Sequence, residues 1–198
     1  GNHLFFTDVC NHHTYRLPES GGAVSGGLNV ANGLDRSLVK VGSHYYGLAI
    51  FPGTMSEPGG PGLYQFDPNT LAVAGGGATP VVSLATPTVI AVDPQTGDLF
   101  IGDATNGIKR VHGLPGTPTV TTFLAGSGSN LYDSLAFNSD GSILYASDRY
   151  NYPNIHIVGL DRTAAKVFDV VDPNQGEGLA VAPPSTTVGG LNVSNNVF

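Results

Sequence analysis

The sequence predicts an all-β protein, a β-propeller built from four-stranded antiparallel blades. Its 28 glycines and 14 prolines, against only 12% charged residues, indicate many short elements joined by turns. Apolar runs that end in aspartate recur along the chain, as HLFFTD (3–8), DLFIGD (98–103) and ILYASD (143–148). Wherever apolar residues recur with helical spacing, a Gly or Pro interrupts the pattern before it is long enough for a helix. Repeated strands without helices favour a propeller.

Each of these runs is followed by a polar loop and a further strand-like segment. The segments are HTYRLP (13–18), GIKRVH (107–112) and NIHIVG (154–159), and GLYQFD (62–67) is the matching segment of one more unit. Equivalent positions recur about every 45 to 49 residues, a spacing typical of propeller blades.

Two further strands complete each unit. A first strand with turn-forming Asp, Asn or Gly after it is predicted in TVIAVDPQTG (88–97), DSLAFNSDGS (133–142) and EGLAVAPPST (177–186). A fourth strand is predicted in TVTTFLAG (119–126) and AKVFDVV (165–171). Each blade therefore has four antiparallel strands, whose apolar faces stack on neighbouring blades.

The second blade leaves two interpretations open. Residues 37–53 supply its first two strands, or residues 46–53 alone form its first strand. We favour the former, because residues 54–62 contain too much Pro and Gly for a strand inside a sheet.

Residues 1–198 are expected to form a single propeller domain of about four to five blades' worth. Either a C-terminal strand completes the N-terminal blade and closes a four-bladed ring, or the domain is incomplete at one or both ends and belongs to a larger ring, for example of six blades. We favour the incomplete domain, because a ring of four blades is sterically tight. Open blade edges would then allow self-association.

Charge and composition exclude several classes of function. The net charge is −7 and no basic run exists, which argues against nucleic-acid binding. No apolar stretch reaches the roughly 18 to 20 residues of a membrane-spanning helix.

The single cysteine, Cys10, rules out an intramolecular disulfide, and CNHH (10–13) is explained better as loop composition than as a metal site. Few lysines with abundant Gly, Ser, Thr and Asn favour an extracellular or cell-surface protein.

The repeat resembles the six-bladed propellers of the NHL and gluconolactonase (senescence-marker protein) superfamily. The phrases AVDPQTGDLFIGDATNGIKRV and LAFNSDGSILYASDRYNYPNIHIVGLD carry the resemblance over two blades. The segment GLAVAPPSTTVGGLNVSNNVF also resembles secreted bacterial propellers of unknown function.

The gluconolactonase resemblance implies a divalent cation on the propeller axis, such as Ca²⁺, and oxygen ligands for it. Glu177 fits the family's glutamate and Asp148 its aspartate, whereas Asp133 stands where an asparagine is expected. Thr88 replaces the other asparagine, and the order of the ligands along the chain also differs from the family's. We therefore expect either no cofactor or a divalent cation held by Glu177, Asp133 and Asp148.

Simpler explanations compete at these residues. The same three acids can cap strands and accept turn N–H groups. Asp8, Asp103 and Asp148 recur at one place in the repeat, and an Asx turn explains them better than a ring of carboxylates. In the loop RYNYP, Arg149, Tyr150 and Tyr152 form a candidate ligand-binding platform, or else cover a blade edge.

Three functions remain open, and no catalytic residue is assigned. We favour a secreted or cell-surface module that binds or scaffolds a protein or carbohydrate ligand. The alternative is a divergent gluconolactonase-like hydrolase of lactones or esters that uses a divalent cation. A further alternative is a structural subunit of an extracellular assembly.

Overall fold

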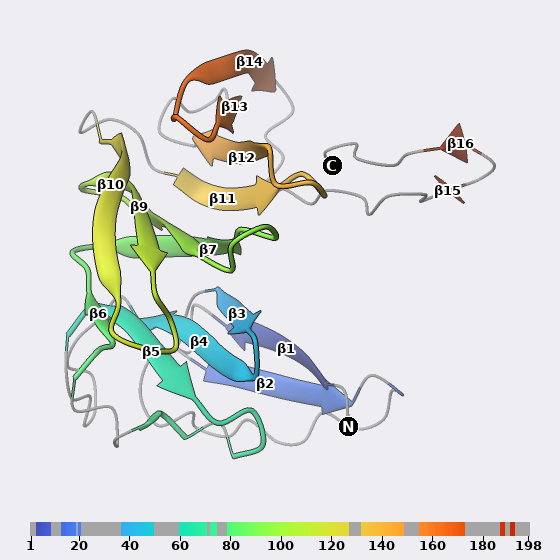
Figure 1. Ribbon diagram of the computed structural model, residues 1–198. Helices are drawn as coiled ribbons and strands as arrows, with labels where there is room; N and C mark the ends of the chain where they lie inside the picture. Colours follow the sequence, from blue (N-terminus) through green and yellow to red (C-terminus); the bar gives the residue numbers. More distant parts are fainter. Residues whose placement is uncertain are drawn as a thin grey trace. The chain divides into compact units, whose positions relative to one another are not determined.

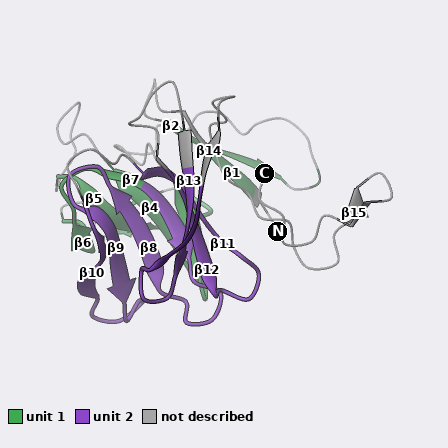
Figure 2. Ribbon diagram, turned by 90° about the horizontal axis from the view of Figure 1, so that it is seen from above, with its two compact units in different colours: residues 1–88 green, residues 89–198 purple. Residues whose placement is uncertain are grey.

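The computed structural model describes residues 3–8, 13–18, 20, 37–49, 60–70, 72–74, 79–126, 132–148, 155–172, 187–188 and 191–192. The chain divides into two compact units, residues 1–88 and residues 89–198 (Figure 2). The described residues form strands and turns but no α-helix (Figure 1). Within those ranges, therefore, no helix is available that could cross a membrane.

The first unit holds one hairpin and one four-stranded blade. The strands are β1 (His3–Asp8), β2 (His13–Pro18), β3 (Leu38–Val41), β4 (His44–Ala49), β5 (Gly62–Phe66) and β6 (Val82–Ser83). Strands β1 and β2 pair with each other, and β3 to β6 form an antiparallel sheet in sequence order. The favoured interpretation of the second blade is confirmed, because residues 38–49 supply its first two strands.

The hairpin packs on the β3–β6 blade through an aromatic cluster. The Phe5 ring on β1 lies 5.9 Å from the Tyr45 ring and 6.0 Å from the Phe66 ring, centroid to centroid. Arg16 on β2 donates a hydrogen bond of 3.1 Å to the Pro68 carbonyl and another to the Asn69 carbonyl. These contacts join residues that are at least 40 positions apart in sequence.

The second unit contains two complete blades, and β7 begins at its boundary. The first blade is β7 (Pro87–Val92), β8 (Leu99–Asp103), β9 (Gly107–His112) and β10 (Thr119–Ala125). The second is β11 (Tyr132–Phe137), β12 (Ile143–Asp148), β13 (Ile155–Asp161) and β14 (Lys166–Asp172). Both sheets are antiparallel and follow the sequence order. The sequence did not predict the last pair, β15 (Thr187–Val188) and β16 (Leu191–Asn192).

The two blades of the second unit share one apolar core. It combines residues of the first blade with residues of the second: Val89, Ala91, Phe100 and Ile108, and Tyr132, Leu135, Leu144, Ala146, Val158 and Leu160. All five residues of β8 are buried, whereas the first four residues of β10 are exposed. Inner strands buried on both faces and outer strands in contact with water are typical of propeller blades.

The observed fold class is the predicted one. The described residues form three antiparallel four-stranded sheets, each built from strands consecutive in sequence, as in an all-β propeller. The number of blades in the intact ring stays a prediction.

Candidate functional site

Asp133 lies in a β-bulge at the beginning of β11. The register between β11 and β12 shifts between Tyr132 and Ser134, so Asp133 is the extra residue on its strand. Bulges of this kind redirect a side chain and are frequent beside functional sites. The hydroxyl of Ser147, itself buried, donates a hydrogen bond of 2.9 Å to Asp133 Oδ1. The bulge and this bond together orient a carboxylate that is only partly buried.

Asp148 ends β12 at the same end of this blade. Its Cα pairs with that of Tyr132, the residue immediately before Asp133. Two of the three proposed metal ligands are thus placed at one end of one blade by the backbone register. The third, Glu177, lies outside the described residues, as does the Asp148 side chain.

Thr88 occupies the position in β7 that Asp133 occupies in β11. Each is the second residue of the first strand of its blade, and each is partly buried. The two positions that the sequence repeat aligned, 88 and 133, are therefore equivalent in their blades. Carboxylate and hydroxyl oxygens are donors that Ca²⁺ and Mg²⁺ accept, so their chemistry fits a hard cation. Among the described residues, no three His, Cys, Asp or Glu side chains gather at one point.

Asp103 is the one of the three recurring aspartates (Asp8, Asp103 and Asp148) whose side chain lies in the described part of the chain. Its Oδ1 accepts hydrogen bonds of 3.0 Å from the backbone N–H of both Thr105 and Asn106. Asp103 is buried and closes the turn between β8 and β9. The Asx turn predicted at this position is confirmed. The side chains of Asp8 and Asp148 lie outside the described part of the chain.

Two other sequence candidates fall outside the structural description. The proposed ligand platform of Arg149, Tyr150 and Tyr152 belongs to residues that are not described, and so do Cys10 and His12. Their assignments stay predictions.

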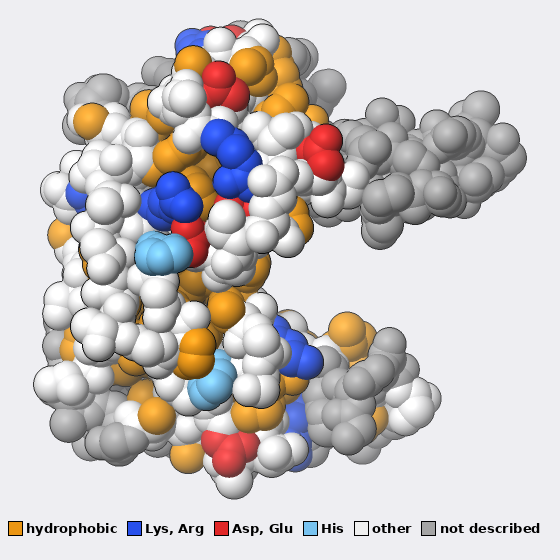
Figure 3. All heavy atoms as spheres, viewed as in Figure 1, with side chains coloured by type: hydrophobic (Ala, Val, Ile, Leu, Met, Phe, Trp, Pro, Cys, Tyr) orange, Lys and Arg blue, Asp and Glu red, His pale blue; other side chains and the backbone are white. Residues whose placement is uncertain are grey.

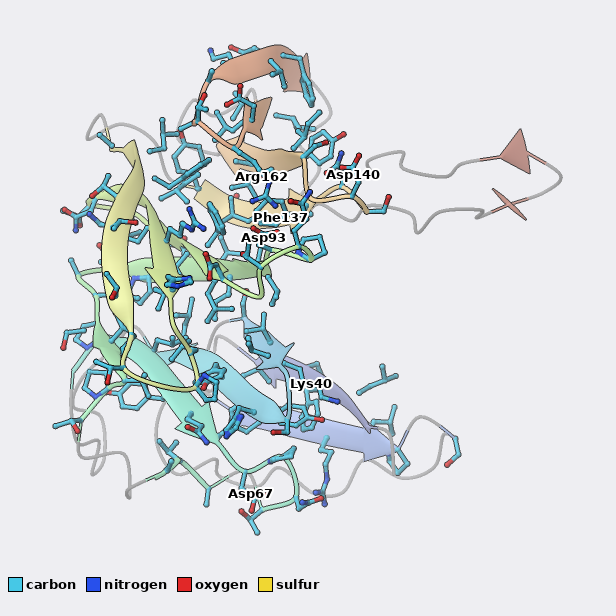
Figure 4. The ribbon with its side chains drawn as sticks, in the orientation of Figure 1. Lys40, Asp67, Asp93, Phe137, Asp140 and Arg162 are labelled. Carbon is cyan, nitrogen blue, oxygen red and sulfur yellow. The ribbon has the colours of Figure 1, made fainter. Side chains whose placement is uncertain are left out.

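An ion pair joins the two blades of the second unit at the end of β11 opposite Asp133. Arg162, in the turn between β13 and β14, donates from Nη1 to Asp93 Oδ2 at 2.8 Å and from Nη2 to Asp93 Oδ1 at 2.7 Å. Asp93 follows β7 and is completely buried. Figure 4 shows Arg162 and Asp93 pointing toward each other, with Asp140 beside them. Planar two-bond pairing of this kind is the strong form of the Arg–carboxylate interaction.

The electrostatics of Asp93 follow from these contacts. Burial raises the pKa of its carboxyl, but hydrogen bonds from Arg162, from the Gln95 N–H and from Thr96, with the charge of Arg162, lower the pKa to about 2. Asp93 is therefore ionised at neutral pH. The pairing also raises the pKa of Arg162.

The turn before β12 packs directly over this ion pair. Gly141 has a φ of +70°, and a Cβ added there would lie 3.1 Å from Asp93 Oδ1 and 3.1 Å from Arg162 Nη2. Gln95 also donates a side-chain hydrogen bond to the Asp140 carbonyl. Both the left-handed backbone and the close approach favour glycine at this position.

A second buried carboxylate, Asp98, binds two side chains of β9. Arg110 donates from Nε to Asp98 Oδ2 at 2.7 Å, and His112 Nδ1 lies 2.7 Å from Asp98 Oδ1. Because an ionised carboxylate only accepts, Nδ1 of His112 is the donor. Burial raises the pKa of Asp98, but the hydrogen bonds from His112 and Arg110 outweigh it and lower the pKa overall. The sequence reasoning missed this cluster.

A cavity of about 120 Å³ lies between the two blades and beside both arginines. We call it the inter-blade cavity. Its lining is Phe100, Arg110, Phe123, Phe137, Ser142, Leu160, Asp161 and Arg162. Figure 3 shows basic side chains gathered next to hydrophobic ones on this face of the molecule.

Comparison with known proteins identifies a solved structure with a similar fold. No protein-family model matches the sequence, and no curated protein matches it either. The structure is similar to that of a gluconolactonase from Xanthomonas campestris, described as important in glucose secondary metabolic pathways. The TM-score is 0.64 at 13% sequence identity, and the match covers 90% of this chain. This likeness shows a gluconolactonase-like β-propeller fold.

The matched structure is longer than this chain. The chain spans 62% of the length of that gluconolactonase. The activity of the whole gluconolactonase is therefore carried over only as a proposal.

Proposed function

We propose that this chain acts in the hydrolysis of a lactone or a related ester, at the end of the β11–β14 blade that carries Asp133. The observation that carries the proposal is the bulge at Asp133, which places an oriented carboxylate beside the end of β12 in a gluconolactonase-like fold. The likeness in fold supports this choice over a pure binding module.

The residues that would hold a divalent cation are Asp133, Asp148 and Glu177. Their hard oxygen donors suit Ca²⁺ or Mg²⁺, and a cation bound there would polarise a lactone carbonyl and acidify water. Two positions depart from the family's ligand set, since Asp133 and Thr88 stand in place of asparagines.

The chain's own groups have defined parts in this proposal. Ser147 holds Oδ1 of Asp133 through its hydroxyl, which fixes the direction of the carboxylate. A partly exposed carboxylate at the start of a strand can accept a proton from a water molecule that attacks the lactone. A lactone hydrolysed in this way yields a hydroxy acid and consumes one water.

The experiment measures calcium binding and lactone hydrolysis on the purified chain. Asp133→Ala removes the carboxylate with both of its oxygen donors, and Asp169→Ala is the matched control because it removes a carboxylate from the outer strand β14 of the same unit. We expect Asp133→Ala to weaken Ca²⁺ binding by at least about tenfold and to abolish hydrolysis of glucono-1,5-lactone, while Asp169→Ala leaves both unchanged. Equal behaviour of the two variants, or hydrolysis no faster than in buffer, would contradict the proposal.

The second candidate is the binding module favoured by composition, and one observation supports it. The outer strands β10 and β14 expose Val120 and Val167, so both blades of the second unit offer solvent a strand edge with an apolar side chain. Such edges accept an extended peptide as an added strand. In this proposal the chain works outside the cell or at its surface, alone or as a subunit of an assembly. Tight capture of a partner by a chain without any turnover would favour it.

A further inference from the structure

The inter-blade cavity has an aromatic floor built from both blades. The Phe100 ring lies 4.8 Å from the Phe123 ring and 5.0 Å from the Phe137 ring, and both pairs meet edge to face. Leu160 of β13 completes the apolar wall. An engineered cavity of about 150 Å³ in another protein binds benzene. The inter-blade cavity, at about 120 Å³, is somewhat smaller, so a single aromatic ring is the largest group that we expect it to admit.

The rim of the cavity carries two guanidinium groups held in fixed positions. Arg110 is tied to Asp98 through Nε and Nη2, and Arg162 is tied to Asp93 through Nη1 and Nη2. Both aspartates are almost fully buried, so they fix the planes of the guanidinium groups. Each guanidinium has five N–H donors, and these pairings leave some of them for another acceptor.

The third charged group of the rim, Asp161, has one carboxylate oxygen engaged within its own turn. Asp161 Oδ1 accepts hydrogen bonds of 2.8 Å from the Thr163 N–H and 2.9 Å from the Ala165 N–H. These bonds close its own turn. The rim therefore presents two oriented cationic donors and the Ser142 side chain to the solvent side of an aromatic pocket.

We propose that the inter-blade cavity binds a small aromatic carboxylate. The ring would pack against Phe100, Phe123 and Phe137, and the carboxylate would accept hydrogen bonds from Arg110 and Arg162. Preorganised arginines suit a planar carboxylate because their donor spacing matches its two oxygens. The cavity lies at the other end of β11 from Asp133, so this binding does not depend on the proposed hydrolysis.

The test uses benzoate as the probe and benzamide as its neutral counterpart. Titration of the full chain, followed by calorimetry and by amide NMR shifts, should give a dissociation constant on the order of millimolar for benzoate, as is usual for so small a ligand. Benzamide should bind at least about fivefold more weakly. The shifted amides should cluster at Phe100, Phe123, Phe137 and Arg162.

Two variants with the same change of charge separate the cavity from general electrostatics. Arg110→Gln removes a rim donor, and Lys109→Gln removes the neighbouring cation of β9, whose Nζ instead donates to Thr122 at 2.9 Å. Arg110→Gln should weaken benzoate binding about tenfold, and Lys109→Gln less than twofold.

Equal affinity for benzoate and benzamide would overturn the proposal, as would equal effects of the two variants. So would amide shifts that avoid the cavity. If Arg110→Gln fails to fold, the comparison of benzoate with benzamide on the unmodified chain decides the question.

Discussion

Removing the guanidinium of Arg162 tests how the two blades of the second unit are held together. Arg162→Met keeps most of the side-chain stem and leaves Asp93, which is 0% exposed, without its cation. The matched control is Lys166→Met, which also removes one positive charge, but from an exposed pair with Asp169 three residues away.

The expected loss follows from burial and from the pKa of Asp93. The difference between its ordinary pKa of 3.8 and the folded value of about 2 corresponds to roughly 2 kcal/mol of stabilisation. Leaving a buried charge unpaired generally costs about 3–5 kcal/mol. Since the Arg162 side chain is 34% exposed, water can enter the vacated space, and we expect a loss of about 3 kcal/mol. The exposed pair at Lys166 should contribute much less, because water and salt screen it and holding its long side chains in one geometry costs entropy.

Urea unfolding followed by far-UV circular dichroism measures both variants, because the chain has no tryptophan to report by fluorescence. Amide hydrogen exchange should then show faster opening in β7 and β11 for Arg162→Met alone. A loss below about 1 kcal/mol, or a loss equal to that of Lys166→Met, would refute the assigned role of the ion pair.

The pH dependence gives an independent check with a defined sign. The folded pKa of Asp93 lies below its unfolded value, so its contribution is present above about pH 4 and is lost as the pH falls toward 2. Between pH 5.5 and 2.5 the unmodified chain should lose roughly 1.5 kcal/mol that Arg162→Met does not lose. If the free energy of unfolding fell equally with pH in the unmodified chain and in Arg162→Met, the assigned role of Asp93 would be contradicted.

Three further substitutions test the local structure. Gly141→Ala should cost about 1–2 kcal/mol by urea unfolding, because its φ is +70° and the new Cβ crowds Asp93; no measurable loss would show that the turn can relax. Asp103→Ala should cost about 1 kcal/mol through loss of the bond to the Thr105 N–H, and Asp103→Asn should restore most of it; equal losses would argue against the Asx turn. Leu144→Ala should cost about 2–5 kcal/mol, since Leu144 is 1% exposed in the shared core, and a melting temperature within a degree or two of the original would contradict that packing.

The strands could be predicted because their signals are local. The apolar runs in 99–103 and 143–148, and the turn chemistry in 93–97 and 138–142, depend on neighbouring residues alone. The repeat then fixed the order of the strands within each blade. The short pair β15 and β16 escaped prediction, because two-residue strands carry too little pattern to be recognised.

The ion pair between Asp93 and Arg162 could not be predicted, because it depends on tertiary packing. Asp93 and Arg162 are 69 residues apart, and each looks like an ordinary turn residue in the sequence. Asp93 does accept the N–H of Gln95 at 2.8 Å, so the turn explanation is true but incomplete. The only signal available was the scarcity of charge: with few basic residues, an arginine within a strand or turn is worth testing as a buried partner.

The two ends of β11 serve different purposes, and this separation supports treating them as separate sites. At one end, the buried carboxylates of Asp93 and Asp98 are each paired with an arginine, and the Asp93–Arg162 pair joins one blade to the next. At the other end, Asp133 lies on a bulge, partly exposed and held by a neutral hydroxyl from Ser147. A bulge and a hydroxyl that together orient a partly exposed carboxylate are the arrangement that a cation-binding or proton-accepting site needs.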